Sequence, residues 1–227
     1  MTPRDPLALL RDVGALITND HLVYTSGRHG SSYVNKDALY PHTAATSAVC
    51  AQLAQHYAAA QVQVVAGPTV GGVIMAQWTA HHLSSLLGYE VLAVYAEETL
   101  TSDGNKERTF RRGYDALVAG KRVLVVEDIL TTGGSARMVV AAVVAAGGDV
   151  VGVGALCNRG DLSAAQLNAP QLYCLSNVPL ESYSAEACPL CAAGVPVNMR
   201  LGKGAAFVAL RDGGRSFGGH APEPPSD

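Results

Sequence analysis

Residues 121–135 read KRVLVVEDILTTGGS, and this stretch decides both the fold and the type of ligand. The apolar run 123–126 predicts a strand buried in a parallel sheet. Two carboxylates, Glu127 and Asp128, close that strand, and the hydroxyl- and glycine-rich turn 131–135 opens a helix of Ala, Val and Met. Ligands of open α/β sheets bind at the carboxyl ends of the strands, so we expect a binding site at this junction.

The composition of the turn indicates the ligand. Its small residues can aim backbone N–H groups and hydroxyls at a phosphate, at the positive end of a helix dipole. Glu127 and Asp128 would repel that phosphate, so they are expected to hold sugar hydroxyls, directly or through a divalent cation. The pattern therefore indicates a ribose phosphate. The P-loop and dinucleotide fingerprints are absent. The alternative is an αβ junction without a ligand.

Composition limits the class of protein. The chain has 227 residues, 48% of them hydrophobic and 15% charged, which suits one full core. Its net charge of −3 argues against nucleic acid as the main partner. No apolar run approaches 18 residues, and the N-terminus does not read as a secretory signal. We therefore expect a cytoplasmic protein without a membrane partner.

Hydrophobic periodicity predicts alternating strands and helices. Helices are expected at 7–17, 43–60, 73–87 and 136–146, and strands at 62–66, 91–95, 123–126 and 150–156. This order predicts an α/β fold with a mostly parallel central sheet flanked by helices. Residues 97–113 are expected to form a polar loop and 195–210 a hairpin. Residues 212–227 are expected to be a mobile tail.

Two further segments suit a charged leaving group. The turn 67–72, GPTVGG, also lies between a strand and a helix, and its glycines would let backbone approach a diphosphate. An ordinary αβ turn is the alternative.

Six of the sixteen basic residues lie in or just after the polar loop: Lys106, Arg108, Arg111, Arg112, Lys121 and Arg122. They suit a mobile lid over a diphosphate, or else a solvated charged face.

Arg159 follows the strand predicted at 150–156 and should also lie at a carboxyl strand end. Its planar guanidinium could bind a carboxylate through two parallel hydrogen bonds. A surface salt bridge is the alternative.

The cysteines allow a metal site but do not require one. Cys188 and Cys191 have the C-x-x-C spacing of a zinc half-site or a redox pair. There is no second C-x-x-C, and no histidine lies at the local spacing of a zinc finger. We therefore expect a reduced structural pair, with bound zinc as the alternative.

With these segments in place, the chain resembles the orotate phosphoribosyltransferases, which are type I phosphoribosyltransferases. The matching segments are 14–16, 21–29 (HLVYTSGRH), 33–36 (YVNK), 67–72, 95–97, 110–114 (FRRGY), 127–135 and 158–160. The resemblance implies transfer of a phosphoribosyl group from phosphoribosyl diphosphate (PRPP) to orotate, in pyrimidine biosynthesis. It also implies one domain over 1–211, with a core at about 42–177 and a small hood from 1–41 and 178–211.

The resemblance also implies partners and site residues. The partners would be orotate, PRPP and a second copy of the chain in a homodimer. Magnesium would be carried by the diphosphate substrate, with no direct protein ligand. Orotate would contact Thr131, Arg159, Tyr33 and Val34. The PRPP contacts would be Glu127, Asp128, Ile129, Leu130, Thr131, Thr132, Gly133, Gly134, Ser135, Val70 and Gly71. Lys106 and Arg108 are the candidate catalytic residues of the lid.

The chain departs from the family pattern at four positions. Better-known members carry Lys where this chain has Thr25 and Gly71, and commonly a basic residue at the position of Glu98. Asn158 replaces a usual Asp. A transferase for another base, or a regulator that senses PRPP without turning it over, therefore remains as an alternative function.

Overall fold

The computed structural model describes residues 5–24, 26–178 and 181–212. The chain divides into two compact units. The core unit comprises Met1–Ile17 and Val34–Leu180, and the small unit comprises Thr18–Tyr33 and Glu181–Asp227. Thr25 and residues 213–227, most of the expected tail, lie outside the described residues.

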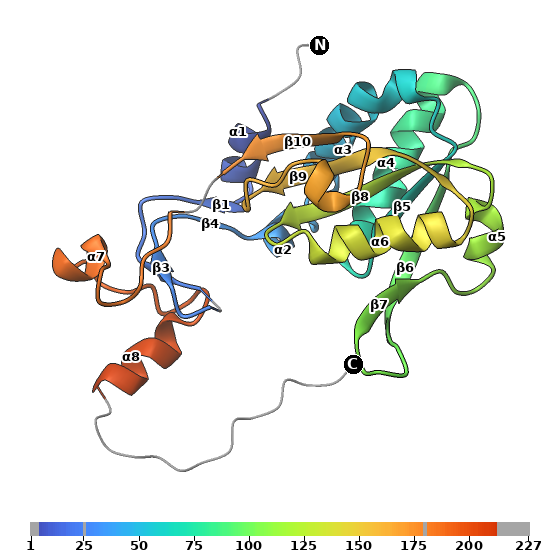
Figure 1. Cartoon of the computed structure of the whole chain (residues 1–227). Helices are drawn as coiled ribbons and strands as arrows, with labels where there is room; N and C mark the ends of the chain where they lie inside the picture. The colour runs from blue at the N-terminus through green and yellow to red at the C-terminus, as the bar shows by residue number, and fades with distance from the viewer. Residues whose placement is uncertain (1–4, 25, 179–180, 213–227) are drawn as a thin grey trace. The chain divides into compact units, whose positions relative to one another are not determined.

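The core unit contains a six-stranded sheet in the order β10-β9-β8-β5-β6-β7 (Figure 1). All neighbouring strands are parallel except β7, which is antiparallel to β6. The bounds are β5 Val64–Pro68, β6 Leu92–Leu100, β7 Lys106–Thr109, β8 Arg122–Leu130, β9 Asp149–Asn158 and β10 Leu172–Asn177. The predicted α/β class with a mostly parallel sheet is therefore confirmed.

Helices cover both faces of this sheet, because side chains alternate along each strand. Leu124 and Val126 of β8 pack in one hydrophobic cluster with α3 (Thr43–Tyr57) and α4 (Gly71–Leu87). Val123 and Val125 pack in a second cluster with α6 (Gly134–Ala145). β8 is thus buried on both sides, as its continuous apolar run predicted.

The remaining elements of the core unit are short. They are α1 Pro6–Asp12, β1 Leu16–Ile17, α2 Lys36–Leu39, η1 Ala58–Ala60, α5 Tyr114–Val118 and η2 Ala165–Leu167. β1 pairs with β4 (Tyr33–Val34). Among the described residues, none of the helices is long and apolar enough to cross a membrane.

The small unit is built from two segments far apart in the sequence. β2 (Leu22–Val23) pairs antiparallel with β3 (His29–Gly30), and His29 forms a bridge to Tyr183. Two helices follow, α7 (Pro189–Ala192) and α8 (Gly204–Asp212). The hairpin predicted over 195–210 is wrong, because residues from Gly204 onward are helical; the run Ala-Ala-Phe-Val-Ala-Leu suits a helix better than a turn-centred pair of strands.

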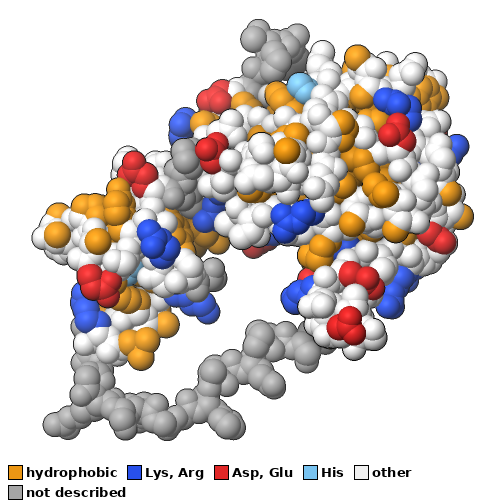
Figure 2. Space-filling view, in the orientation of Figure 1, with side chains coloured by type: hydrophobic (Ala, Val, Ile, Leu, Met, Phe, Trp, Pro, Cys, Tyr) orange, Lys and Arg blue, Asp and Glu red, His pale blue; other side chains and the backbone are white. Residues whose placement is uncertain are grey.

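The predicted polar loop 97–113 is also largely ordered into strands. β6 continues to Leu100 and pairs with β7 through Glu98↔Arg108 and Leu100↔Lys106, with a tight turn at 101–105. We call this element the β6–β7 hairpin. Figure 2 shows acidic and basic side chains close together over it. Cross-strand pairing of opposite charges explains how so polar a segment forms strands.

Candidate active site

The turn between β8 and α6 forms a small anion-sized cavity. Gly133 precedes the helix with φ of 69°, a left-handed conformation that glycine adopts without strain. The cavity has a volume of about 110 Å³ and is lined by Glu127, Ile129, Leu130, Thr131, Thr132, Gly133, Gly134, Ser135 and Ala136. The hydroxyls and the first N–H groups of a three-turn helix therefore meet at one place, as the sequence predicted for a phosphate site.

The acid pair lies just before this turn and is almost completely buried. Glu127 is 7% exposed and Asp128 is 3% exposed. Because β8 continues to Leu130, both residues lie inside the strand and do not close it as expected from the sequence. Oδ2 of Asp128 accepts a hydrogen bond of 2.6 Å from the Tyr40 hydroxyl and lies 2.8 Å from Nζ of Lys36. Oδ2 of Asp128 is therefore held by two partners, Tyr40 and Lys36.

Burial changes the protonation of this network. Burial, together with the charge of Asp128, raises the pKa of Glu127 to about 8. Burial and the charge of Asp128 also raise the pKa of Tyr40, so its hydroxyl remains a donor. For Lys36, burial alone would lower the pKa, but the hydrogen bond and charge of Asp128 outweigh it and raise the pKa. The cluster thus holds one compensated charge pair beside a carboxyl that is easily protonated.

The turn 67–72 packs directly against the acid pair. A Cβ added at Gly71 would collide with Oδ2 of Asp128 and the hydroxyl of Tyr40. A Cβ at Gly67 would collide with the backbone of Gly72. A side chain at position 71 is therefore excluded by packing, which gives a local physical reason for glycine at this departure from the family pattern.

The two lid candidates have different environments on the β6–β7 hairpin. The Arg108 side chain is only 8% exposed and donates from Nη1 to Oγ1 of Thr69 at 2.7 Å and to the Ala96 carbonyl at 3.2 Å. The Lys106 side chain is 65% exposed, with Nζ 2.7 Å from Glu98. Glu98 also lies 3.8 Å from Nη2 of Arg108. Arg108 thus connects the hairpin to the turn 67–72, whereas Lys106 is at the surface.

Hydrogen bonds to the last residue of β8 hold Arg159 beside the turn 131–135. The backbone N–H groups of Arg159 and Gly160 both donate to the Leu130 carbonyl, at 2.8 and 3.1 Å. A Cβ at Gly160 would collide with the Thr131 carbonyl. Arg159 and Thr131, the two candidate orotate contacts of the core unit, therefore lie at one strand end. Tyr33 and Val34 form β4, and their role toward the base stays a prediction.

Asn158 has a structural function next to Arg159. Its side-chain nitrogen donates to the Leu162 carbonyl at 2.9 Å, and its side-chain oxygen accepts from the Leu162 N–H at 3.0 Å. A carboxylate can accept but cannot donate. The amide thus closes the loop after β9, which explains its presence where the family pattern has Asp.

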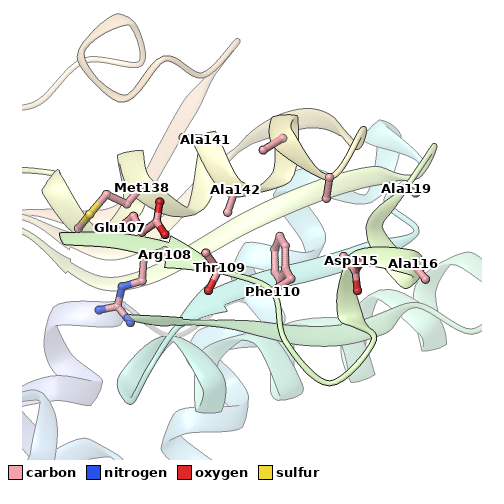
Figure 3. Close-up of a pocket in the computed structure, with 12 residues that line it drawn as sticks. Glu107, Arg108, Thr109, Phe110, Asp115, Ala116, Ala119, Met138, Ala141 and Ala142 are labelled. Atoms are coloured by element: carbon pink, nitrogen blue, oxygen red, sulfur yellow. The ribbon is translucent and has the colours of Figure 1, made fainter. Parts of the chain in front are cut away.

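A second cavity, of about 600 Å³, lies between the β6–β7 hairpin, α5 and α6. Figure 3 shows the ring of Phe110 in this cavity, with Met138 and alanines of α6 along one wall. Arg108 lies at one end of it (Figure 3). The acid pair and the turn 131–135 do not line this cavity, so it is separate from the candidate active site.

Two residues of the site were not assigned from the sequence: Lys36 and Tyr40. They lie about ninety positions before Asp128 in the chain, and their contact depends on where α2 packs. The only available signal was the location of Lys36 directly after the Tyr-Val-Asn segment.

Comparison with known proteins agrees with this geometry. A family model described as phosphoribosyl transferase domain matches residues 35–170. That span contains the whole sheet except β10, the acid pair, both turns and Arg159. The fold is thus that of a phosphoribosyltransferase, and the chain contains the domain that defines this class of protein.

Similar proteins of known name identify the family within this class of transferases. An orotate phosphoribosyltransferase of Chlorobium phaeobacteroides is 34% identical over 85% of this chain and 92% of its own length. One of Pelotomaculum thermopropionicum is 35% identical over 86% and 95%. A crystal structure of Mycobacterium tuberculosis orotate phosphoribosyltransferase in complex with Fe(III) dicitrate superposes with a TM-score of 0.59, at 26% identity, over 77% of this chain and 97% of that one. The chain belongs to the orotate phosphoribosyltransferase family.

Proposed function

We propose that this protein transfers the 5-phosphoribosyl group of PRPP to orotate, forming orotidine 5′-monophosphate and diphosphate. The observation that carries the proposal is the junction of β8 and α6, where a buried acid pair and a phosphate-sized turn occur together. Membership in the family supplies the base and the reaction class.

The β8–α6 junction would fix the ribose at both ends. The turn 131–135 accommodates the 5-phosphate at the N-terminus of α6, while Glu127 and Asp128 hold the ring hydroxyls. Lys36 and Tyr40 already orient Asp128, so little reorganisation is needed on binding. Positioning of this kind lowers the entropic part of the barrier.

The diphosphate would leave from the side of the turn 67–72. In the displacement, the bond from the anomeric carbon to the diphosphate oxygen breaks, a bond to a ring nitrogen of orotate forms, and the proton of that nitrogen is released to the diphosphate or to solvent. Negative charge accumulates on the leaving diphosphate. Backbone N–H groups at Val70 and Gly71 and the cation of Arg108 are suited to stabilise it. Magnesium enters as part of the PRPP substrate, bound by oxygens of the diphosphate, with no direct protein ligand.

The base would lie at the end of β9. Orotate differs from uracil by a carboxylate, and Arg159 supplies a planar cation at that strand end. Thr131, Tyr33 and Val34 complete the proposed base contacts. Lys106 and Arg108 act from the β6–β7 hairpin as the lid, and the protein works as a homodimer.

The test is to mix the protein with magnesium, PRPP and each base separately. Orotate should be consumed, seen as loss of its ultraviolet absorbance, with equimolar release of diphosphate. Turnover of uracil or a purine with no reaction of orotate would assign another base. Tight calorimetric binding of PRPP without turnover of any base would identify a regulator and overturn the proposal.

A further inference from the structure

Two histidines and two cysteines converge in the small unit. Their ligand atoms, from His21, His29, Cys188 and Cys191, all lie within 4.8 Å of one another. Both histidines are 0% exposed, Cys188 is 2% exposed, and Cys191 is half-buried. Sequence spacing alone favoured a reduced structural pair, because the histidines lie more than 150 residues before the cysteines. Folding makes them neighbours.

The distances agree with a tetrahedral site. Zinc bonds of about 2.3 Å to sulfur and about 2.0–2.1 Å to nitrogen separate a sulfur from a nitrogen by about 3.6 Å in a tetrahedron. Nε2 of His21 lies 3.6 Å from Sγ of Cys188 and 3.6 Å from Sγ of Cys191. Sγ of Cys191 lies 3.3 Å from Nδ1 of His29. The two nitrogens are 3.0 Å apart, against about 3.3 Å in the same tetrahedron.

The hydrogen bonding of His21 leaves its Nε2 nitrogen available to bind a metal ion. Its Nδ1 lies 2.7 Å from the Val195 carbonyl, which can only accept, so Nδ1 carries the proton. Nε2 is then left with a lone pair directed at the cysteines. Metal-binding histidines commonly donate their other N–H to a backbone carbonyl in this way.

The backbone brings the four groups together through local hydrogen bonds. His29 exchanges two backbone hydrogen bonds with Tyr183, each of 2.8 Å, which connects β3 to the second segment of the unit. Cys188 precedes α7 and its carbonyl accepts from Ala192, so Cys191 lies on the first helical turn beside it. Asn198 donates its N–H to the His21 carbonyl. Both halves of the ligand set are thus held in place by the main chain.

The small unit has few other means of holding together. Among its described residues, the buried apolar side chains are Leu22, Val23, Tyr24 and Cys188. Met199 is 52% exposed and Leu210 is 81% exposed, and Figure 2 shows hydrophobic side chains on the surface of this unit. Small units with so little core usually depend on a disulfide or a structural metal.

We propose that His21, His29, Cys188 and Cys191 bind one zinc ion as a closed structural site of the small unit. Two thiolates and two imidazoles are the donor set that zinc prefers in structural sites. With four protein ligands, no coordination position remains for a substrate. The ion therefore joins residues 18–33 to residues 181–212 and takes no part in the transfer reaction.

Without a metal, the same distances would mean a hydrogen bond from His29 to His21 beside two free thiols. A disulfide between Cys188 and Cys191 is the other metal-free outcome.

Measurement on the full-length protein, purified under reducing conditions from zinc-containing medium, separates these cases. Elemental analysis should find one zinc per chain. A zinc chelator should release it and expose Cys188 and Cys191 to a thiol reagent, as identified by mass spectrometry.

Cobalt gives a readout of the ligand geometry. After exchange of zinc for Co²⁺, the protein should show the strong visible absorption of a tetrahedral site and a thiolate-to-metal charge-transfer band. Weak absorption typical of an octahedral oxygen site would overturn the assignment. Protein that holds no stoichiometric zinc, both as purified and after dialysis against zinc, would overturn it as well.

Variants test the individual ligands. Cys191→Ser and His29→Asn should each lose stoichiometric zinc and the cobalt charge-transfer intensity. Cys174→Ser, at a half-buried thiol of β10, and His81→Gln, at an exposed histidine of α4, should retain both. Full zinc content in Cys191→Ser and His29→Asn contradicts the proposal. If those two variants do not fold, the chelator and cobalt measurements on the unmodified protein still decide it.

Discussion

Glu127 is a buried carboxyl next to the charged carboxylate of Asp128. This environment makes the stability of the folded protein depend on pH. Its pKa is raised to about 8 in the folded protein, from an ordinary value of 4.5. The folded protein therefore binds this proton more tightly than the unfolded chain does. Unfolding releases the proton between these two values, so this contribution to stability is fully present below pH 4.5 and is lost as the pH rises toward 8.

The resulting prediction concerns Glu127→Gln, which stays neutral at every pH. In the unmodified protein, the free energy of unfolding should contain a component that falls between pH 4.5 and 8, and the variant should lack it. Urea unfolding at a series of pH values measures the difference. Glu90→Gln, at an exposed position, serves as the control and should keep the unmodified profile. Parallel pH profiles for the protein and Glu127→Gln would show that this carboxyl ionises normally.

Arg159 should determine affinity for the base but not for the sugar. Removing the charged partner of a buried carboxylate typically costs about 2–5 kcal/mol, so Arg159→Ala should weaken orotate binding by at least about 30-fold. Binding of PRPP should change by no more than a few-fold, because its proposed contacts are at 127–135 and 70–71. Isothermal calorimetry with each ligand measures both.

The matched variant is the double substitution Glu127→Gln with Asp128→Asn, which should show the opposite pattern. If Arg159→Ala retains orotate affinity, the carboxylate of the base is bound elsewhere.

In the β6–β7 hairpin, the cations of Lys106 and Arg108 are already paired with the carboxylate of Glu98. Glu98 contacts both Lys106 and Arg108, and the hydrogen bond from Lys106 is the main reason that the pKa of Glu98 is lowered. These cations must leave Glu98, or share it, to approach a diphosphate. In the proposed lid role, Glu98 would therefore compete with the diphosphate for these cations.

Glu98→Gln should consequently lower the KM for PRPP, by up to about fivefold, the scale of an exposed ion pair. Salt should reduce the difference, because it screens exposed charges. Steady-state kinetics at two ionic strengths measure this effect. Asp103→Asn removes one negative charge from the same hairpin without touching either cation, and should leave KM unchanged. An unchanged KM in Glu98→Gln would argue that the hairpin does not reach the diphosphate.

The sequence predicted the strands and helices that have a clear hydrophobic pattern within their own residues. The four predicted strands and the helices α3, α4 and α6 are present because continuous apolar runs and helical spacing suffice to define them. β10 was not predicted, since its half-buried residues form no clear pattern. The β6–β7 hairpin was read as a loop because its pairing depends on cross-strand charges. Likewise, the residues around Asp128 were only partly foreseen, because Lys36 and Tyr40 reach it through tertiary packing.

At the scale of the whole molecule, the two units differ in how their interiors are built. The core unit buries two hydrophobic clusters on either side of its sheet. The small unit contains two-residue strands, short helices and a few buried apolar side chains among its described residues. Local opening is easiest where buried apolar contact is sparse.

Amide hydrogen exchange should therefore separate the units. Backbone amides of β5, β8 and β9 should be the most strongly protected, and those of 18–33 and 181–212 should exchange by an easier, local opening. Mass spectrometry of peptides from a native-state exchange series measures this. Equal protection in both units would mean that they unfold only together.

The small unit is composed of two segments that lie on either side of residues 34–180 in the sequence. During translation, residues 18–33 emerge before residues 34–180, and that whole stretch must be made before the partner segment appears. At about 5–20 residues per second, that interval lasts roughly seven to thirty seconds. Throughout it, Leu22 and Val23, which are buried in the finished protein, have no partner segment to cover them. Until the second segment is made, the nascent chain thus carries an apolar hairpin that lacks its partner segment.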